Sequence, residues 1–129
     1  MTLERIEQFL MEWKLDIKEI KNSMDYEGYH FQIPFISYNG DWIGGWVLST
    51  DQGFQITDEG EVYFEYEVLG LEKEWNDISK KHFNQYGCEL IDNCIIFNGE
   101  IDKLDTGFSV FLTTICSLHG YLNIRNGEY

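Results

Sequence analysis

The chain has 129 residues, of which 43% are hydrophobic and 16% aromatic, so it is long and apolar enough to fold as a single domain, residues 1–129. Its 23 Asp and Glu residues against 9 Lys and Arg residues give a formal net charge of −14. Without a basic stripe to displace counterions from phosphates, direct nucleic-acid binding is disfavoured. The sequence has no signal-peptide pattern and no apolar run of membrane-spanning length, so we expect a cytoplasmic protein.

The negative charge is concentrated in one window of the sequence. Between Lys21 and Lys73 there is no Lys or Arg, and the window holds ten acids. These acids are Asp25, Glu27, Asp41, Asp51, Asp58, Glu59, Glu61, Glu65, Glu67 and Glu72. The same window is rich in Tyr, Trp and Phe, so a surface formed from it would be both anionic and aromatic.

The first half of the chain predicts a helix followed by three strands. Apolar residues at steps of three and four predict one amphipathic helix over residues 2–22, namely Leu3, Ile6, Leu10, Trp13, Ile17 and Ile20. This stripe also fits a heptad, so it could pack on the protein's own sheet or form a coiled-coil dimer. Residues 29–37, 42–49 and 54–57 predict a three-stranded antiparallel meander, with a hairpin turn at Asn39-Gly40. Pro34 pushes the first strand towards an edge or a bulge.

The second half is predicted to be mainly helical. Apolar and polar residues alternate over residues 62–68, as in a strand. Thr57 or Asp58 can cap a helix, however, and with Asp58 as the cap Glu61 would stand at the N3 position. We therefore expect a helix over about 59–69. The other expected elements are a helix over 74–86, a hairpin of 88–91 and 94–97 around Asp92-Asn93, a helix from about 105 to 119 stopped by Gly120, and a loose tail over 123–129. The predicted fold class is α+β: an N-terminal amphipathic helix, a three-stranded antiparallel meander, two helices, a short β-hairpin and a C-terminal helix.

Two short motifs resemble those of a known family. Residues 56–60 read I-T-D-E-G, and residues 86–92 read Y-G-C-E-L-I-D. They are similar to a family of small bacterial and prophage proteins of unknown function, in which a strand ending in T-D-[DE]-G precedes two helices and a Y-G-[CV]-x-[LI]-x-[DN] strand. The resemblance covers roughly residues 25–120, although residues 62–69 are more aromatic and acidic than the family pattern. It implies an α+β fold and a bacterial or phage setting, and it brings no catalytic residues.

Catalytic and metal-binding interpretations are weakly supported. Asp51, Asp58 and Glu59 with His30 could serve a small carboxylate-dependent hydrolase. The alternative is that the acids cap and stabilise a helix start, while His30 packs among aromatic residues. The three cysteines are Cys88, Cys94 and Cys116, whose spacing suits neither a disulfide nor a zinc site. We therefore expect free thiols, and neither enzymatic activity, a cofactor nor a bound metal.

The acidic window gives the remaining functional hypothesis. On a helix, Asp58, Glu61 and Glu65 would share one face, which is either a solvated surface or one that imitates a nucleic-acid backbone to a cationic groove. The protein-binding residues that we expect are Asp58, Glu59, Glu61, Glu65, Glu67, Glu72, Tyr63 and Tyr66.

The hypothesis is thus a phage or mobile-element protein that inhibits a basic, nucleic-acid-handling host protein, such as a CRISPR or other defence nuclease. The alternative is an antitoxin-like or assembly partner that docks through the N-terminal helix, as a monomer or a homodimer.

Overall fold

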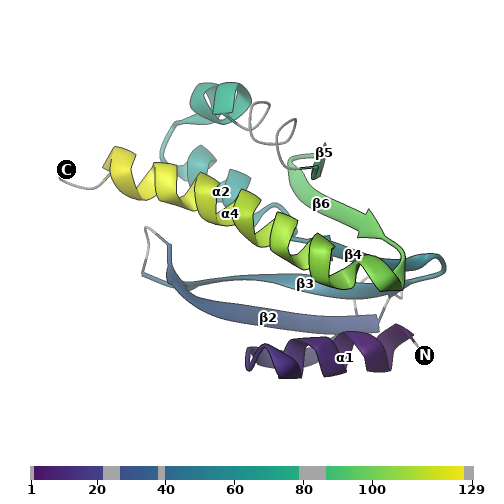
Figure 1. The fold of residues 1–129 in the computed structure, drawn as a ribbon. Helices are drawn as coiled ribbons and strands as arrows, with labels where there is room; N and C mark the ends of the chain where they lie inside the picture. Colours follow the sequence, from purple (N-terminus) through teal and green to yellow (C-terminus); the bar gives the residue numbers. More distant parts are fainter. Residues whose placement is uncertain (1, 22–26, 38–39, 79–86, 127–129) are drawn as a thin grey trace.

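A computed structural model describes residues 2–21, 27–37, 40–78 and 87–126 (Figure 1). It confirms the α+β class, with a six-stranded antiparallel sheet in the order β1-β2-β3-β4-β6-β5. The strands are β1 (Asp16–Lys21), β2 (Glu27–Ile36), β3 (Trp42–Thr50), β4 (Gly53–Thr57), β5 (Glu89–Ile91) and β6 (Cys94–Gly99). The helices are α1 (Thr2–Glu12), α2 (Glu61–Val68), the 3₁₀ helix η1 (Ile101–Lys103) and α4 (Leu104–Asn126), and residues 72–78 are also helical.

The core lies between one face of the sheet and the helices α1 and α4. Alternation along β2, β3 and β4 places side chains such as Phe31, Val47 and Ile56 on this face, fully buried. Phe108 of α4 packs 4.9 Å from Phe31 and 5.3 Å from Phe9 of α1, measured between ring centroids. The two helices therefore cover the same face, α1 over β2 and β3 and α4 over β4 and β6.

The predicted helix over residues 2–22 is wrong beyond Glu12. Lys14 is left-handed (φ 57°), and the backbone N–H of Leu15 donates to Leu10 while that of Lys14 donates to Met11, which ends α1 in a Schellman-type cap. Residues 16–21 then form the edge strand β1, in which Ile17 pairs with the core strand β2. The heptad spacing was therefore accidental, since its two halves lie on different elements. Residue 22, where the predicted helix ends, lies outside the described residues.

The strand predictions are confirmed, and the sheet is larger than expected. The register between β2 and β3 shifts between Ile33 and Ile36, which places the expected bulge at Pro34. Asp92 and Asn93 both have positive φ, as a two-residue hairpin turn of this type requires. The strands β5 and β6 that they connect do not form a separate hairpin, because β6 pairs with β4 and so extends the sheet beyond the meander. Asn39 of the other predicted turn lies outside the described residues.

The helix predicted over 59–69 is confirmed as α2, which begins two residues later than expected. The predicted N-cap at Thr57 or Asp58 is wrong, because the left-handed Gly60 is the N-cap and Glu61 is the first helical residue rather than N3. The helix predicted over 74–86 is present at residues 72–78, and its remainder falls outside the described residues. The last helix does not stop at Gly120, and residues 123–126 are helical rather than a loose tail. The reason is the apolar stripe of α4, which continues to Leu122, fully buried one turn after Leu118. Residues 127–129 lie outside the described residues.

Two glycines of α4 give a matched prediction about this helix. A Cβ added to Gly120 would meet nothing within 4 Å, whereas one added to Gly107 would lie 2.5 Å from a ring carbon of Phe97. Gly120→Ala should therefore raise the free energy of unfolding by about 0.5–1 kcal/mol through helix propensity. Gly107→Ala should lower it by about 1–3 kcal/mol through overpacking. Urea denaturation of both variants checks this, and a loss of stability in Gly120→Ala would contradict a helix that continues past this residue.

Candidate functional site

The turn between β4 and α2 is built around the carboxylate of Asp58, which is 1% exposed. Its Oδ1 accepts hydrogen bonds from the backbone N–H groups of Gly60 (3.0 Å) and Ile95 (2.8 Å), and its Oδ2 accepts one from Val62 (3.0 Å). Burial raises the pKa of Asp58, while these backbone N–H groups act to lower it. One side chain thus joins the end of β4, the start of α2 and the strand β6.

The second turn of α2 is fixed by Tyr66. Its ring is fully buried, 5.2 Å from that of Trp75, and its hydroxyl donates to the backbone carbonyl of Leu118 in α4 at 2.8 Å. With Asp58 holding the first turn and Tyr66 holding the second, α2 presents Glu61 and Glu65 towards the β2–β3 end of the sheet. These two acids line one wall of a pocket.

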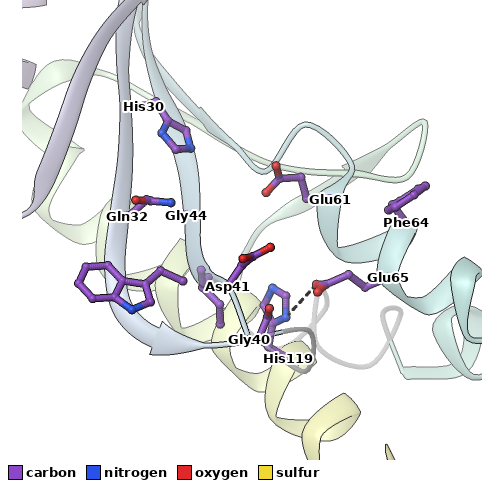
Figure 2. Close-up of a pocket in the computed structure, with 12 residues that line it drawn as sticks. His30, Gln32, Gly40, Asp41, Gly44, Glu61, Phe64, Glu65 and His119 are labelled. Atoms are coloured by element: carbon purple, nitrogen blue, oxygen red, sulfur yellow. Dashed lines mark ion pairs between the residues drawn. The ribbon is translucent and has the colours of Figure 1, made fainter.

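This pocket, which we call the acidic pocket, has a volume of about 480 Å³ and lies between β2, β3, α2 and α4. Its walls include three carboxylates, those of Asp41, Glu61 and Glu65. Figure 2 shows these side chains pointing toward a common space, with His30 on the strand side and His119 of α4 next to Glu65. Residues from four separate parts of the chain therefore meet at one site.

The deepest part of the acidic pocket is a buried carboxyl–imidazole pair. Oε2 of Glu65 lies 3.1 Å from Nδ1 of His119, and the two residues are 8% and 5% exposed. This contact is close enough for an ion pair, but its geometry is not that of a hydrogen bond. Nδ1 therefore makes no hydrogen bond to any of the described residues.

Burial raises the pKa of Glu65 to about 7, opposed by a hydrogen bond from Ser37 and reinforced by the charges of Glu61, Asp41 and Asp58. Burial lowers the pKa of His119 to about 4. Between these values the pair holds one proton and has no net charge, whichever of the two groups carries it.

The grouping of Ser37, Glu65 and His119 is not arranged as a hydrolytic triad. In such a triad the serine hydroxyl bonds to an imidazole nitrogen, and the carboxylate orients the imidazole from its other side. Here the Ser37 side chain hydrogen-bonds to Glu65 instead. The three residues therefore form a polar cluster in which the carboxyl group is central.

The outer part of the pocket combines crowded negative charge with exposed rings. Partial burial of the Glu61 carboxylate raises its pKa, and the negative charges of Asp58, Asp41 and Glu59 raise it further. Beside it, Trp42 is 48% exposed and Phe64 is 61% exposed. An anionic depression with apolar rings at its rim is suited to contact with a protein surface.

The protein-binding residues expected from the sequence divide into two groups. Glu59, Glu61, Glu67 and Glu72 are exposed, and Tyr63 is partly buried with its ring 5.5 Å from that of Trp75. Asp58, Glu65 and Tyr66 are buried, and of these only Glu65 borders the acidic pocket. The predicted row Asp58, Glu61, Glu65 therefore does not form one solvated face, because its first member is enclosed by backbone N–H groups.

The residues that the sequence reasoning missed are Asp41, Trp42, Phe64 and His119. Asp41 and Trp42 follow the β2–β3 turn, and nothing local to the turn indicates that it faces α2. Phe64 stands three residues after Glu61, so on a helix the two side chains lie on the same side. This spacing was the one available signal that the exposed ring of Phe64 stands beside that acid. His119 comes to Glu65 only through the packing of α4.

The four residues considered for a hydrolase are not brought together. Asp51 lies at the β3–β4 turn beside Gln55, His30 lines the acidic pocket, and Glu59 borders a shallow depression next to Asp92. The fourth, Asp58, is buried under its three N–H donors. In the part of the chain that the structure describes, no three His, Cys, Asp or Glu side chains gather so that they could hold a metal ion.

The cysteines and the helices complete this description. Cys88, Cys94 and Cys116 are all free thiols, as expected, and burial raises the pKa of each. None of the helices within the described ranges is long and apolar enough to cross a membrane.

The fold and the site together define a small antiparallel α+β domain with an acidic pocket rimmed by aromatic residues. Comparisons with protein-family models, with curated proteins and with solved structures find no match. The relationship to the small bacterial and prophage family therefore stays a prediction based on the two sequence motifs.

Proposed function

We propose that the protein is a non-enzymatic interaction protein that binds a basic, nucleic-acid-handling protein through its acidic pocket and the acids around it. The observation that carries this proposal is that the carboxylates of Asp41, Glu61 and Glu65 line one pocket. Burial raises the pKa of both Glu61 and Glu65, and the charges of neighbouring carboxylates raise both further. Such crowding costs folding free energy, and a cationic partner would relieve it. The repulsion within the free protein is thus a source of affinity for a basic partner.

We define the acidic face as Asp41, Glu59, Glu61, Glu65 and Glu67 with the exposed rings of Trp42 and Phe64. The rings supply apolar anchors that lose water on binding, and the surrounding carboxylates attract the partner at long range. No Lys or Arg occurs between Lys21 and Lys73, so the segment that forms this face has no positive side chain of its own. Association should be fast at low salt and should weaken as salt screens the charges.

The proposed partner is a host nuclease whose cationic channel tracks nucleic-acid phosphates, and a CRISPR or other defence nuclease is the first class to test. The setting would be the cytoplasm of a bacterial host, with the protein encoded by a phage or mobile element. This part of the proposal is supported by the two motifs that resemble the prophage family, by the small size and by the net charge of −14.

The test is to capture partners from a bacterial lysate with the purified protein and with two variants, each of which replaces three glutamates by lysine. One variant carries Glu59→Lys, Glu61→Lys and Glu67→Lys on the acidic face, and it leaves the buried Glu65 intact. The control carries Glu12→Lys, Glu89→Lys and Glu100→Lys, all exposed positions on other elements. Both variants have the same net charge, so they differ only in where the charge lies.

We expect the wild type and the control to capture a nucleic-acid-binding protein, and the acidic-face variant to lose it. Raising the salt to about 0.5 M, where the screening length falls to a few Å, should also release the partner. Added DNA or RNA should compete for the same channel. If the acidic-face variant captures the same protein as the wild type, the acids serve solubility and the proposal is wrong.

A further inference from the structure

We infer that the acidic pocket receives the guanidinium group of an arginine side chain from the partner protein. This inference rests on the proposed function, because it names the group that a basic partner would insert. The pocket volume of about 480 Å³ falls within the range of about 300–1,000 Å³ that is typical of ligand sites. The site is therefore large enough for one long side chain.

The arrangement of the carboxylates favours arginine. Asp41 directly precedes β3, whereas Glu61 and Glu65 come from successive turns of α2, and the three point into the same space (Figure 2). A guanidinium group is planar and has five N–H donors, so it can bond to two carboxylates at once, whereas an ammonium group acts as a compact point charge. An anionic ligand would be repelled by the carboxylates of this pocket.

The buried imidazole gives a second, independent observation. Nδ1 of His119 makes no hydrogen bond to the described residues although its residue is only 5% exposed, and it lies 3.1 Å from Oε2 of Glu65 at the wall of the pocket. A buried polar atom without a hydrogen bond is costly in the free protein, and the contact with Glu65 offsets only part of that cost. A positive group beside Glu65 favours the ionised carboxylate, and an ionised carboxylate 3.1 Å from Nδ1 favours the protonated imidazole, so we expect the shared proton to move towards His119. A small rotation of either side chain would then let Nδ1–H donate to Glu65, and the carboxylate would bridge the imidazole and the guanidinium.

This proton transfer is a signature of a positive group inside the pocket, which attraction to the outer acids alone would not produce. At pH 6 the free pair holds one proton, because the pKa of Glu65 is raised to about 7 and that of His119 is lowered to about 4. The charged or titratable groups that face Glu65 are Asp41, Glu61, Asp58 and His119, with the Ser37 side chain hydrogen-bonded to it. Arginine binding should therefore shift the imidazole resonances of His119 towards those of the protonated ring, with no change in pH.

The experiment titrates the ¹⁵N-labelled protein at pH 6 with the capped peptide acetyl-Gly-Gly-Arg-Gly-Gly-amide. Matched peptides carry citrulline, which is a neutral analogue of arginine, or lysine. With the arginine peptide we expect shifts at the amides of Gly44, Glu61 and Phe64 together with the His119 signature. The citrulline peptide should give no shifts, and the lysine peptide should bind at least threefold more weakly.

Two variants with the same change in charge locate the binding. Glu61→Gln removes one pocket carboxylate and should weaken the arginine peptide about three- to tenfold. Asp102→Asn removes an exposed acid of η1, just before α4, and should change binding less than twofold, since α4 runs about 22 Å along its axis from Leu104 to His119. Equal losses in the two variants, equal binding of lysine, or shifts spread over all acidic residues would overturn the inference.

The two proposals can fail separately. If the wild type captures a nucleic-acid-binding protein, and neither Glu61→Gln nor excess arginine peptide reduces this capture, the arginine site is wrong and the proposed function stands. If the peptide binds in the pocket with the His119 signature but no nucleic-acid-binding protein is captured, the proposed function is wrong and the pocket remains an arginine site.

Discussion

Asp58→Ala is expected to lower the free energy of unfolding by about 3–5 kcal/mol, a large part of the stability of a domain of this size. The substitution removes the acceptor of three backbone N–H groups, those of Gly60, Val62 and Ile95. Each N–H that stays buried without a partner costs about 1–3 kcal/mol, and relaxation of the turn recovers part of the sum. The loss should appear as a lower midpoint in urea denaturation, with β6 and α2 losing amide protection first.

Two further substitutions separate this role from a loss of charge. Asp58→Asn keeps one oxygen, which can still accept from Gly60 and Ile95, while its amide group would face the N–H of Val62. It should therefore cost about 1–3 kcal/mol, less than the alanine variant. The neighbouring exposed Glu59→Gln removes the same charge and should stay within about 0.5 kcal/mol of the wild type. Equal effects of Asp58→Asn and Glu59→Gln would contradict a structural role for this carboxylate.

The position of Asp58 also determines how binding experiments should be interpreted. Because its carboxylate joins β4, β6 and the first turn of α2, its loss would displace Glu61 and Glu65 together. A failure of Asp58 variants to bind a partner would then report a disordered pocket. Substitutions at the exposed Glu61 test the surface itself.

Local sequence patterns predicted those parts of the fold that depend on local chemistry. The alternation before Asp58 and the capping residues around it were enough to predict a strand that leads into a helix, and Asp92-Asn93 was enough to predict a hairpin. The bond from Ile95 to Asp58 spans 37 residues, so no local pattern indicated that the hairpin would join the main sheet beside β4. The cap of α1 was missed because Lys14 occupies the left-handed position that glycine usually marks.

The acidic pocket was only partly predictable for the same reason. Charge patterning identified Glu61 and Glu65, but helical spacing cannot show which acids are enclosed. The burial of Glu65 depends on β2 and on α4, whose His119 is 54 positions further along the chain. The raised pKa of Glu65 is thus a property of the tertiary structure, and it gives the second large prediction.

Glu65 and His119 should make opposite contributions to the pH dependence of the free energy of unfolding, and the two contributions should nearly cancel. The pKa of Glu65 is raised from 4.5 to about 7 by folding, so the folded state binds the extra proton and stability falls as pH rises through this window. The pKa of His119 is lowered from 6.5 to about 4, so here the unfolded state binds the extra proton and stability rises as pH rises between these values. Between pH 4.5 and 6.5 the folded and unfolded states hold the same number of protons on this pair, and its net contribution is flat.

Replacing one member of this pair should reveal how the other member makes the free energy of unfolding depend on pH. Relative to the wild type, Glu65→Gln should gain about 2 kcal/mol of stability as pH rises from 4.5 to 6.5, because only the rising contribution of His119 remains. His119→Gln should lose about as much over the same range. These values allow for screening by solvent that enters the pocket, and they are smaller than the full shifts would give. Urea midpoints at several pH values measure them, with the exposed Glu67→Gln as a control that should run parallel to the wild type. If both pair variants also ran parallel to it, the two groups would titrate normally, and the proton transfer expected on arginine binding would lose its basis.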